Sequence, residues 1–587
     1  MSDPARLIRL IADGGARADA AAVSIARAEE PIAERAEWRL LLVAAAFLIG
    51  FAAVALKMSA TVMLTPFEPR VARAVERHPE RAPILDRAGR PLALNLPAWS
   101  IYAHPREMDD PEAAAFLLAE ALDLDPERMA RKIAPGRTFA WVKRPVTPEE
   151  RQRVHDLGLP GVYFGEREAR VYPAGRVAAH ILGGARDGEE SVHSAELVGL
   201  AGVERWFDER LRDSARGGAP LRLSIDLAAQ AALTDVLREA MERFDAVGAA
   251  GVLMEARTGK LAAMVSLPDF DPNQRPNPAD PEVMKTRPLL NRAAGGVYEL
   301  GSTFKPIFAA LAMQQGVATP DTPLDAKGPL RWGRFAIRDF HRMDPVLTLT
   351  ETMVESSNVA TGRLAMMIGT PAAQAFLREL GFFDPPPVEI AEAGLGKPLL
   401  PPRWSELSTI TISYGHGLAA TPLHLAAAYA TLTNGGLKVR PTLDATAAPP
   451  GEADRVVSER VSRDMRDILR AIVTRGTGKN AEVDGYEVGG KTGTADKPKP
   501  GGGYYDKKVI ATFAAVFPVS DPEYVLVLSL DEPEDRSTSI TRRTAGWTAA
   551  PTAGAAIARL APLLGLRPKL PQPEPALPAP LAVAAVE

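Results

Sequence analysis

The longest uninterrupted apolar segment of the chain lies near its N-terminus. Leu40 to Leu56 runs for 17 residues without a charged side chain, which is the short end of the length that a bilayer-spanning helix needs. No polar face breaks the run, so a buried core helix is the weaker alternative. A cleaved signal peptide is a closer rival, but 39 residues precede the run, whereas a whole signal peptide usually takes about 15–30 residues. We therefore expect residues 40–57 to form an uncleaved transmembrane signal anchor.

Basic residues on either side of this anchor predict its orientation. Only Lys57 lies immediately beyond the apolar run, and Lys and Arg accumulate on the cytoplasmic side of membrane helices. We therefore expect residues 1–39 to be a cytoplasmic tail and the large C-terminal part to be exported to the periplasm. The expectation depends on the arginines of the tail, which are Arg6, Arg9, Arg17, Arg27, Arg35 and Arg39.

Beyond the anchor the chain changes pattern twice. Residues 58–225 are broken by Pro and Gly and lack a long helical period, which predicts short strands and loops with one helix near Pro111–Ala121. A strong helical pattern then runs from Leu227 to Phe244, with Asp226 as its expected N-cap. The Pro-rich tail at 566–587 is expected to be disordered or extended.

Strand-like runs stand at both ends of the region 226–565. Because these strands are separated in sequence by helices, we predict a mixed α/β (α+β) domain with a largely antiparallel sheet covered by helices. The expected strands are 251–255 and 261–265, which form a hairpin, and 509–516 and 524–530, which are joined by a Pro-containing turn; the expected helices include 425–433 and 460–474.

Composition narrows the function classes. The chain has 587 residues, 46% hydrophobic and 24% charged, and a net charge of −4 without a basic stripe, so nothing points to nucleic acid. It has no cysteine, which excludes a disulfide framework, a zinc site with thiolate ligands and a cysteine nucleophile. No metal or cofactor is expected. His416 and His424 lie in different local contexts, and packing is the favoured role for both.

Three short clusters carry the candidate chemistry, in the order of an S-x-x-K, S-x-N and K-T-G set. They are Ser302 to Lys305, Ser356 to Asn358, and Lys491 to Thr494. Each cluster alone is a weak signal, since a chain of this length contains an S-x-x-K by chance about twice. Together, in this order, they predict a serine acyl-transferase that opens amides and β-lactams.

The first cluster supplies a nucleophile and its base. Ser302 precedes an apolar helical run at 307–313, so it should lie at a helix start, where N–H groups favour a developing anion. Lys305 follows one turn later on the same face. A serine hydroxyl needs an adjacent base, and a lysine serves as that base only when burial and a second cation lower its pKa. Lys491 is the candidate second cation. The alternative for an isolated match is an N-cap serine with a solvated lysine.

The other two clusters supply a group that relays a proton and a set of residues that binds a carboxylate, called here the carboxylate clamp. Ser356 and Asn358 follow a short predicted helix at 349–354, and we expect them in an extended turn that faces one cleft. There Ser356 would relay a proton and Asn358 would hold a substrate amide. The alternative without a catalytic role is a turn on the surface. Residues 488–495 predict an edge strand that a substrate backbone can approach closely. There Lys491, Thr492, Gly493 and Thr494 would bind a terminal carboxylate, and the backbone N–H groups of Ser302 and Thr494 would form an oxyanion hole.

Longer segments identify a family resemblance that covers nearly all of the exported part. The chain resembles the class B penicillin-binding proteins, most of all the division-specific (septal) peptidoglycan transpeptidases. The resemblance rests on RAPILDRAG at 81–89 with PLA at 91–93, RVYPAG at 170–175 with AAHILG at 178–183, GLAGVE at 199–204, NRA at 291–293, and SYGHG at 413–417 with TPL at 421–423. Departures from the family's usual residues are Ala82, Glu255, Leu300 and His424, none of them within the catalytic clusters.

The resemblance implies an elongated, β-rich, non-catalytic pedestal (dimerisation-like) domain at 58–225 and a penicillin-binding, serine β-lactamase-like transpeptidase domain at 226–565. It implies D,D-transpeptidation of peptidoglycan stem peptides through a serine acyl-enzyme at the inner membrane, during septal wall synthesis, with diaminopimelate as acceptor amine. Implied partners are stem peptides or their lipid-linked precursor, β-lactams, a SEDS-type glycosyltransferase and bitopic division proteins. Nucleic acid is not an expected partner.

Several alternatives remain open on the sequence. An elongation-specific transpeptidase shares the catalytic clusters. A class A β-lactamase or a carboxypeptidase passes the acyl group to water and lacks the pedestal. A non-catalytic division scaffold would make the clusters incidental, and a penicillin sensor is disfavoured because the 39-residue tail leaves no room for an effector domain.

Overall fold

The computed structural model describes residues 38–59, 81–191, 194–499 and 501–569. The chain divides into two units, 1–77 and 78–587, each described by itself. In the first unit, Trp38–Ser59 forms one helix of 22 residues that is long and apolar enough to cross a membrane, as the apolar run predicts. The cytoplasmic tail expected at 1–39 and the Pro-rich tail expected at 566–587 lie mostly outside the described residues.

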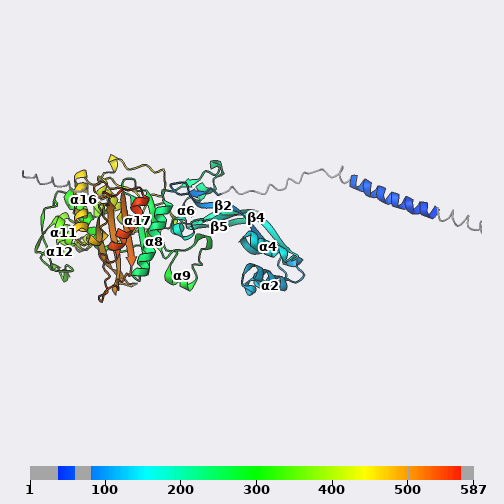
Figure 1. Cartoon of the computed structure of the whole chain (residues 1–587), viewed down its shortest axis with the longest axis horizontal. Coiled ribbons are helices and arrows are strands. Elements are labelled where there is room, and N and C mark those ends of the chain that lie inside the picture. The colour runs from blue at the N-terminus through cyan, green and yellow to red at the C-terminus, as the bar shows by residue number, and fades with distance from the viewer. Residues whose placement is uncertain (1–37, 60–80, 192–193, 500, 570–587) are drawn as a thin grey trace, which may run out of the picture. The chain divides into compact units, whose positions relative to one another are not determined.

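The core of the second unit is a five-stranded sheet in the order β14-β15-β16-β8-β9, with every neighbouring pair antiparallel. The strands from the two sequence ends of the region meet in the middle, where β16 pairs with β8. The sheet confirms the predicted architecture (Figure 1). Its strands are β8 (Gly248–Glu255), β9 (Leu261–Leu267), β14 (Gly489–Pro498), β15 (Tyr504–Phe517) and β16 (Tyr524–Asp531).

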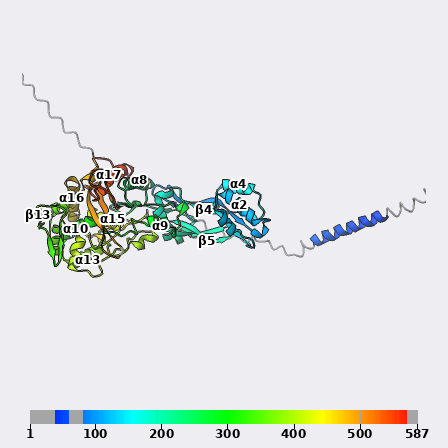
Figure 2. The same ribbon diagram turned by 90° about the horizontal axis from the view of Figure 1, so that it is seen from below.

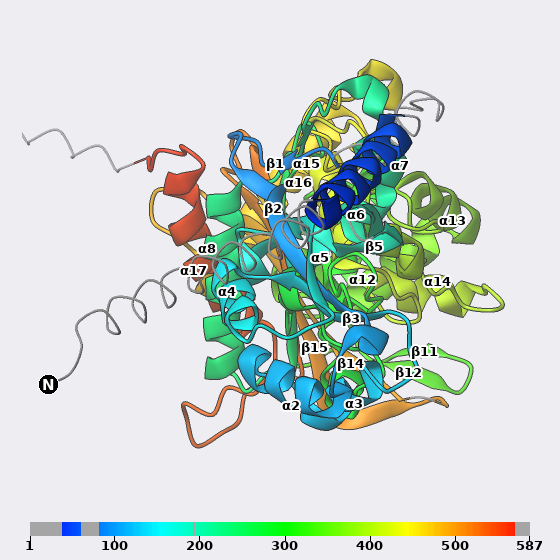
Figure 3. The same ribbon diagram turned by 90° about the vertical axis from the view of Figure 1, so that its right-hand side faces the viewer.

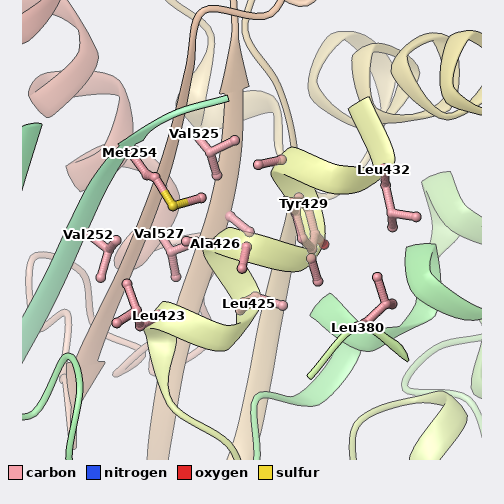
Figure 4. Packing of buried hydrophobic residues seen from close by; sticks show 14 of the residues in the cluster. Val252, Met254, Leu380, Leu423, Leu425, Ala426, Tyr429, Leu432, Val525 and Val527 are labelled. Carbon is pink, nitrogen blue, oxygen red and sulfur yellow. The ribbon is translucent and has the colours of Figure 1, made fainter. Parts of the chain in front are cut away.

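Alternating side chains of the central strands build two cores, one on each face of the sheet. In β16, Val525 and Val527 belong to one core, whereas Leu526 and Leu528 belong to the other. This two-residue period is what a strand buried on both faces requires. On the first face, α15 (Pro422–Thr433) packs its Leu423 against the strands (Figure 4).

Helices close both faces. On the second face, α8 (Leu227–Arg243) and α17 (Ala549–Leu563) lie side by side (Figures 1 and 3). Asp226 caps α8 as predicted, because its carboxylate accepts from the N–H groups of Ala228 and Ala229. The first face carries the helices α10 (Lys305–Gln314), α11 (Leu349–Glu355), α12 (Asn358–Ile368), α13 (Thr370–Glu379), α14 (Glu406–Ser413), α15 and α16 (Glu459–Arg475).

The region before α8 is built on a second sheet, in which β2 pairs with β1, β3 and β4. The strand lengths differ from prediction: β2 has 13 residues and β4 has 10, because Pro91 and Pro97 do not interrupt the pairing of β2. Helices α2 and α4 lie beside β4 (Figure 2). The elements are β1 (Ile84–Leu85), β2 (Pro91–Ala103), α2 (Pro111–Leu122), α3 (Pro126–Lys132), β3 (Ala140–Val146), α4 (Pro148–Asp156), β4 (Val162–Val171), β5 (Gly184–Ser191), β6 (Ser194–Ala201), α6 (Gly202–Trp206) and β7 (Leu221–Arg222).

Three residues from the segments that carry the resemblance converge in a buried ion cluster of this region. Glu204 accepts from Arg81 at 2.6 Å and from Arg170 at 2.8 Å, and all three side chains are at most 3% exposed. Tyr172 donates its hydroxyl to Glu204 at 3.3 Å. The three segments are therefore held together by one carboxylate shared between two guanidinium groups.

Polar contacts also join this region to the one that follows it. Arg87 pairs with Glu255 at the end of β8, and the N–H of Gly202 donates to Glu392 at 3.0 Å. The short strands β1 and β7 pair in parallel, which brings the first and last strands of the region together immediately before α8.

Candidate active site

Ser302 lies in the 3-10 turn η5 (Gly301–Phe304), which leads directly into α10. The turn packs tightly on β14: a Cβ on Gly301 would lie 2.7 Å from the Thr494 carbonyl oxygen, and one on Gly493 would lie 2.2 Å from the Leu300 carbonyl oxygen. Gly301 also has φ +57°, a conformation that favours glycine. The two glycines therefore let the nucleophile's turn and the K-T-G strand touch backbone to backbone.

Lys305 is the first residue of α10 and is completely buried. Its Nζ donates to the main-chain oxygen of Ser356 at 2.5 Å and to the Ser356 hydroxyl at 3.0 Å. Burial, and then the charge of Lys491, lower the pKa of Lys305 well below its ordinary value. Among the described residues the Ser302 hydroxyl has no hydrogen-bond partner, so no hydrogen bond joins it to Lys305. The predicted hydrogen bond between the Ser302 hydroxyl and Lys305 is thus not formed in this structure. Catalytic hydrogen bonds of this kind often form only when substrate binds.

Ser356 lies in the short connection between the helices α11 and α12. It ends α11 in the left-handed region, with φ 62° and ψ 44°, and α12 begins at Asn358 after the N-cap Ser357. The prediction of an extended turn is therefore wrong, because Ser357 caps a helix that starts within the motif. Both Ser356 and Asn358 nevertheless line the same cavity, and the amide of Asn358 donates to the Arg338 carbonyl at 3.2 Å.

Lys491 completes the cluster from the edge strand β14, where the sequence predicted it. It is fully buried, and its Nζ donates to the Ser356 hydroxyl at 2.9 Å and to the Thr492 carbonyl at 3.1 Å. Burial lowers the pKa of Lys491 to about 7. One hydroxyl therefore accepts from the Nζ atoms of two lysines that lie 186 residues apart in the chain.

A cavity of about 640 Å³ lies over this cluster. Ser302, Ser356, Asn358, Thr492 and Thr494 line it. Thr492 and Thr494, two residues apart on β14, line the same cavity, and Lys491 reaches the cluster through the Ser356 hydroxyl. The site thus combines a half-buried, cavity-lining hydroxyl on a helix-start turn, an edge strand and a buried pair of lysines, as acyl transfer through a serine requires.

Asp339 is a site residue that sequence reasoning missed. Its carboxylate accepts from the Ser357 hydroxyl at 2.9 Å and from the N–H groups of Asn358 at 2.5 Å and Val359 at 3.1 Å. A carboxylate at the first turn of α12 satisfies unpaired donors and complements the helix dipole. No local pattern sets this aspartate apart, because the residues it holds follow 18 to 20 positions later.

A second missed group borders the cavity. His416 pairs with Glu299 at 3.2 Å, and Tyr504 of β15 donates its hydroxyl to the same carboxylate at 3.1 Å. Glu299 raises the pKa of His416. His416 therefore lies at the cavity's border rather than in packing, whereas His424 is packed as expected, stacked on Phe382.

Family comparisons match both regions of the second unit. The penicillin-binding protein transpeptidase domain matches residues 249–555, and the penicillin-binding protein dimerisation domain matches residues 76–217.

Named relatives and a solved structure agree with these matches. The chain is 39% identical over 501 residues to the probable peptidoglycan D,D-transpeptidase FtsI of Caulobacter vibrioides, covering 83% of this chain and 82% of that one. It is 30% identical to peptidoglycan D,D-transpeptidase FtsI of Escherichia coli K12, covering 84% and 86%. The crystal structure of penicillin-binding protein 3 from Mycobacterium tuberculosis, complexed with aztreonam, has a TM-score of 0.63 at 25% identity, covering 84% and 98%. The chain therefore belongs to the penicillin-binding proteins, as a member of the FtsI group of peptidoglycan D,D-transpeptidases.

Proposed function

We propose that this chain cross-links peptidoglycan stem peptides through an acyl-enzyme on Ser302. The observation that carries the proposal is the Ser356 hydroxyl, which accepts from both Lys305 and Lys491 under the cavity that Ser302 lines. A neutral amine, a relay hydroxyl and a nearby cation are the groups that proton transfer to and from a serine needs.

The first half-reaction forms the ester. The Ser302 oxygen attacks the carbonyl carbon of the penultimate D-Ala, and neutral Lys305 takes the hydroxyl proton. The N–H groups of Ser302 and Thr494 stabilise the oxyanion. The peptide C–N bond then breaks, and the leaving D-Ala amine receives a proton from Lys305 through the Ser356 hydroxyl. Lys491, Thr492 and Thr494 hold the terminal carboxylate, and Asn358 holds the donor amide.

The second half-reaction transfers the acyl group to an amine of a neighbouring stem. The amine attacks the ester carbonyl, loses its proton through the same relay, and Ser302 leaves with a proton from Lys305. The acceptor amine is diaminopimelate in this proposal. A β-lactam would acylate Ser302 because its strained amide and carboxylate occupy the places of the peptide bond and the terminal D-Ala.

Benzylpenicillin labelling of the purified full-length chain tests the nucleophile. We expect one covalent adduct, located on Ser302 by peptide mass mapping and absent from a Ser302→Ala variant. Ser405→Ala, which removes the cap hydroxyl of α14, is the matched control and should still be labelled. An adduct on another residue, or none, would reject the proposed mechanism. Incubation with a donor peptide and either an amine or water alone then distinguishes transpeptidation from hydrolysis.

We also propose a place for the activity in the cell. The helix Trp38–Ser59 would anchor the chain in the inner membrane, with the part from residue 58 in the periplasm, because the arginines precede the apolar run that begins at Leu40. The pairing of β1 with β7 supports a pedestal at 58–225 and a transpeptidase domain at 226–565. A SEDS-type glycosyltransferase and bitopic division proteins would be the partners. A fluorescent fusion that labels the side wall rather than midcell would reject the septal assignment.

A further inference from the structure

A second cavity lies outside the candidate active site and shares no lining residue with it. It has a volume of about 700 Å³. It lies at the end of the central sheet where β8 begins and where β9 and β16 end, next to the helix α9 (Pro281–Thr286). Cavities of several hundred cubic ångströms with converging polar groups are the usual form of a ligand site.

Charge in the wall of this cavity is mostly positive. Four cations line it, Lys285, Arg287, Arg292 and Lys497, against the single carboxylate of Asp531. Asp531 is already bonded to Lys497 at 2.7 Å. The exposed pair of Lys285 with Glu282 at 3.4 Å contributes little, since both side chains are more than 70% exposed.

Arg292 is the most deeply buried of these cations. It is 6% exposed, and its guanidinium donates only to the carbonyl oxygens of Arg287 at 3.2 Å and Thr286 at 3.3 Å. In the part of the chain that the structure describes, no carboxylate lies within ion-pair distance of it. Burial lowers the pKa of Arg292, and the nearby Tyr298 and Asp531 offset only part of that shift. A buried charge that makes no direct ion pair is unfavourable, and an anion in the cavity would reduce that cost.

We propose that this cavity binds an anion that carries phosphate or carboxylate groups, held by Arg292 at the base and by Lys285 and Arg287 at the mouth. Guanidinium groups present paired N–H donors that match phosphate and carboxylate oxygens. The ligand would also touch the segment Gly295–Tyr298, which continues directly to Ser302.

Calorimetric titration of the full-length chain in detergent micelles tests the site. Inorganic pyrophosphate and tricarballylate are the two probes, because they carry similar charge on phosphate and on carboxylate groups. The chain is first saturated with benzylpenicillin so that the carboxylate clamp near Lys491 is occupied. Failure of that acylation bears on the proposed function alone, and the titration is then run on the unacylated chain.

A paired charge-removal variant locates the binding. Lys285→Gln with Arg287→Asn changes two exposed side chains, whereas Arg460→Gln with Arg463→Gln removes two exposed cations from α16 as the control. We expect saturable binding of at least one probe, weakened about tenfold by the first pair and unchanged by the control. Preference for pyrophosphate or for tricarballylate identifies the anion class. Absence of binding to both probes, or equal weakening by both variants, would overturn the proposal.

Discussion

Ser356 presents both its main-chain oxygen and its hydroxyl to the Nζ of Lys305, at 2.5 and 3.0 Å. A left-handed backbone at Ser356, with φ 62°, directs both groups to the same side. Such a conformation in a non-glycine residue is unfavourable and is common at functional sites. In the proposed mechanism, this conformation allows one residue to hold the base and to relay its proton.

Removal of this hydroxyl should slow acylation without preventing it. In Ser356→Ala, Lys305 keeps its carbonyl contact and Lys491 keeps its bond to the Thr492 carbonyl, but the leaving amine loses its proton relay. We expect the rate of acylation by a fluorescent penicillin to fall about 100-fold or more, measured by stopped-flow. Ser405→Ala should match the wild type. A rate within a factor of about two of the wild type would exclude the relay role.

The activity should fall on the alkaline side near neutral pH. Burial lowers the pKa of Lys491 to about 7 in the free protein, so the clamp loses its charge as the pH rises through that value. A carboxylate bound at Lys491 favours the charged form of the lysine, so in the complex the alkaline decline of the rate moves to higher pH. We therefore expect the second-order acylation rate to decline above about pH 7 while the first-order rate declines at higher pH.

Lys491→Arg provides the control for this profile, because arginine stays charged across the range. Its absolute rate should be lower, since the planar guanidinium does not fit the ammonium site, but its alkaline limb should be absent. A wild-type profile that stays flat from about pH 6 to 9 would contradict the titration of Lys491.

Loss of the base should increase stability. Because the folded state lowers the pKa of Lys305, the unfolded chain binds a proton that the folded chain does not, between the folded pKa and about 10.4. Stability from this group therefore rises with pH in that window. Lys305→Met removes the buried amine, and we expect about 1–3 kcal/mol of added stability near pH 7 together with loss of acylation.

Thermal unfolding of the full-length chain in detergent, followed at several pH values, measures this effect. The wild type should gain stability from pH 7 to 9 more steeply than Lys305→Met. An unfolding temperature lowered by the substitution would mean that the contacts with Ser356 outweigh the cost of burying the amine.

The sequence predicted the site residues that belong to short motifs. It did not predict the residues that reach the site only because the chain folds back on itself. Ser302, Lys305 and Lys491 follow from local clusters, and the apolar runs predicted strands at both sequence ends but not the pairing of β16 with β8. The helix boundary inside the second cluster was missed because Ser357 caps α12 through the Ala360 N–H and donates its hydroxyl to Asp339, a contact between residues 18 positions apart. That contact arises from a loop whose path no local periodicity encodes.

Asp339 should act on catalysis through the residues that it holds. Asp339→Asn keeps an acceptor oxygen but loses the charge that binds three donors at the start of α12. We expect the first-order acylation rate to fall about tenfold while the initial dissociation constant for penicillin barely changes, because Asn358 and Ser356 shift slightly. Asp344→Asn in the same exposed loop is the matched control. Equal losses in both variants would point to a general disturbance of the loop.

Glu204 should determine the stability of the region that precedes α8 and leave the chemistry intact. Its carboxylate is the common partner of Arg81 and Arg170, which are at most 3% exposed, so Glu204→Gln leaves buried Arg170 without its paired carboxylate and Arg81 with Asp208 alone. Such losses typically cost about 3–5 kcal/mol. We expect amide hydrogen exchange in β2 and β4 to accelerate strongly, whereas β14 to β16 stay protected. Glu120→Gln, on the exposed side of α2, should change neither. Equal deprotection of both sheets would mean that the two regions unfold as one, and unchanged protection of β2 and β4 would show that the cluster is not a major source of stability.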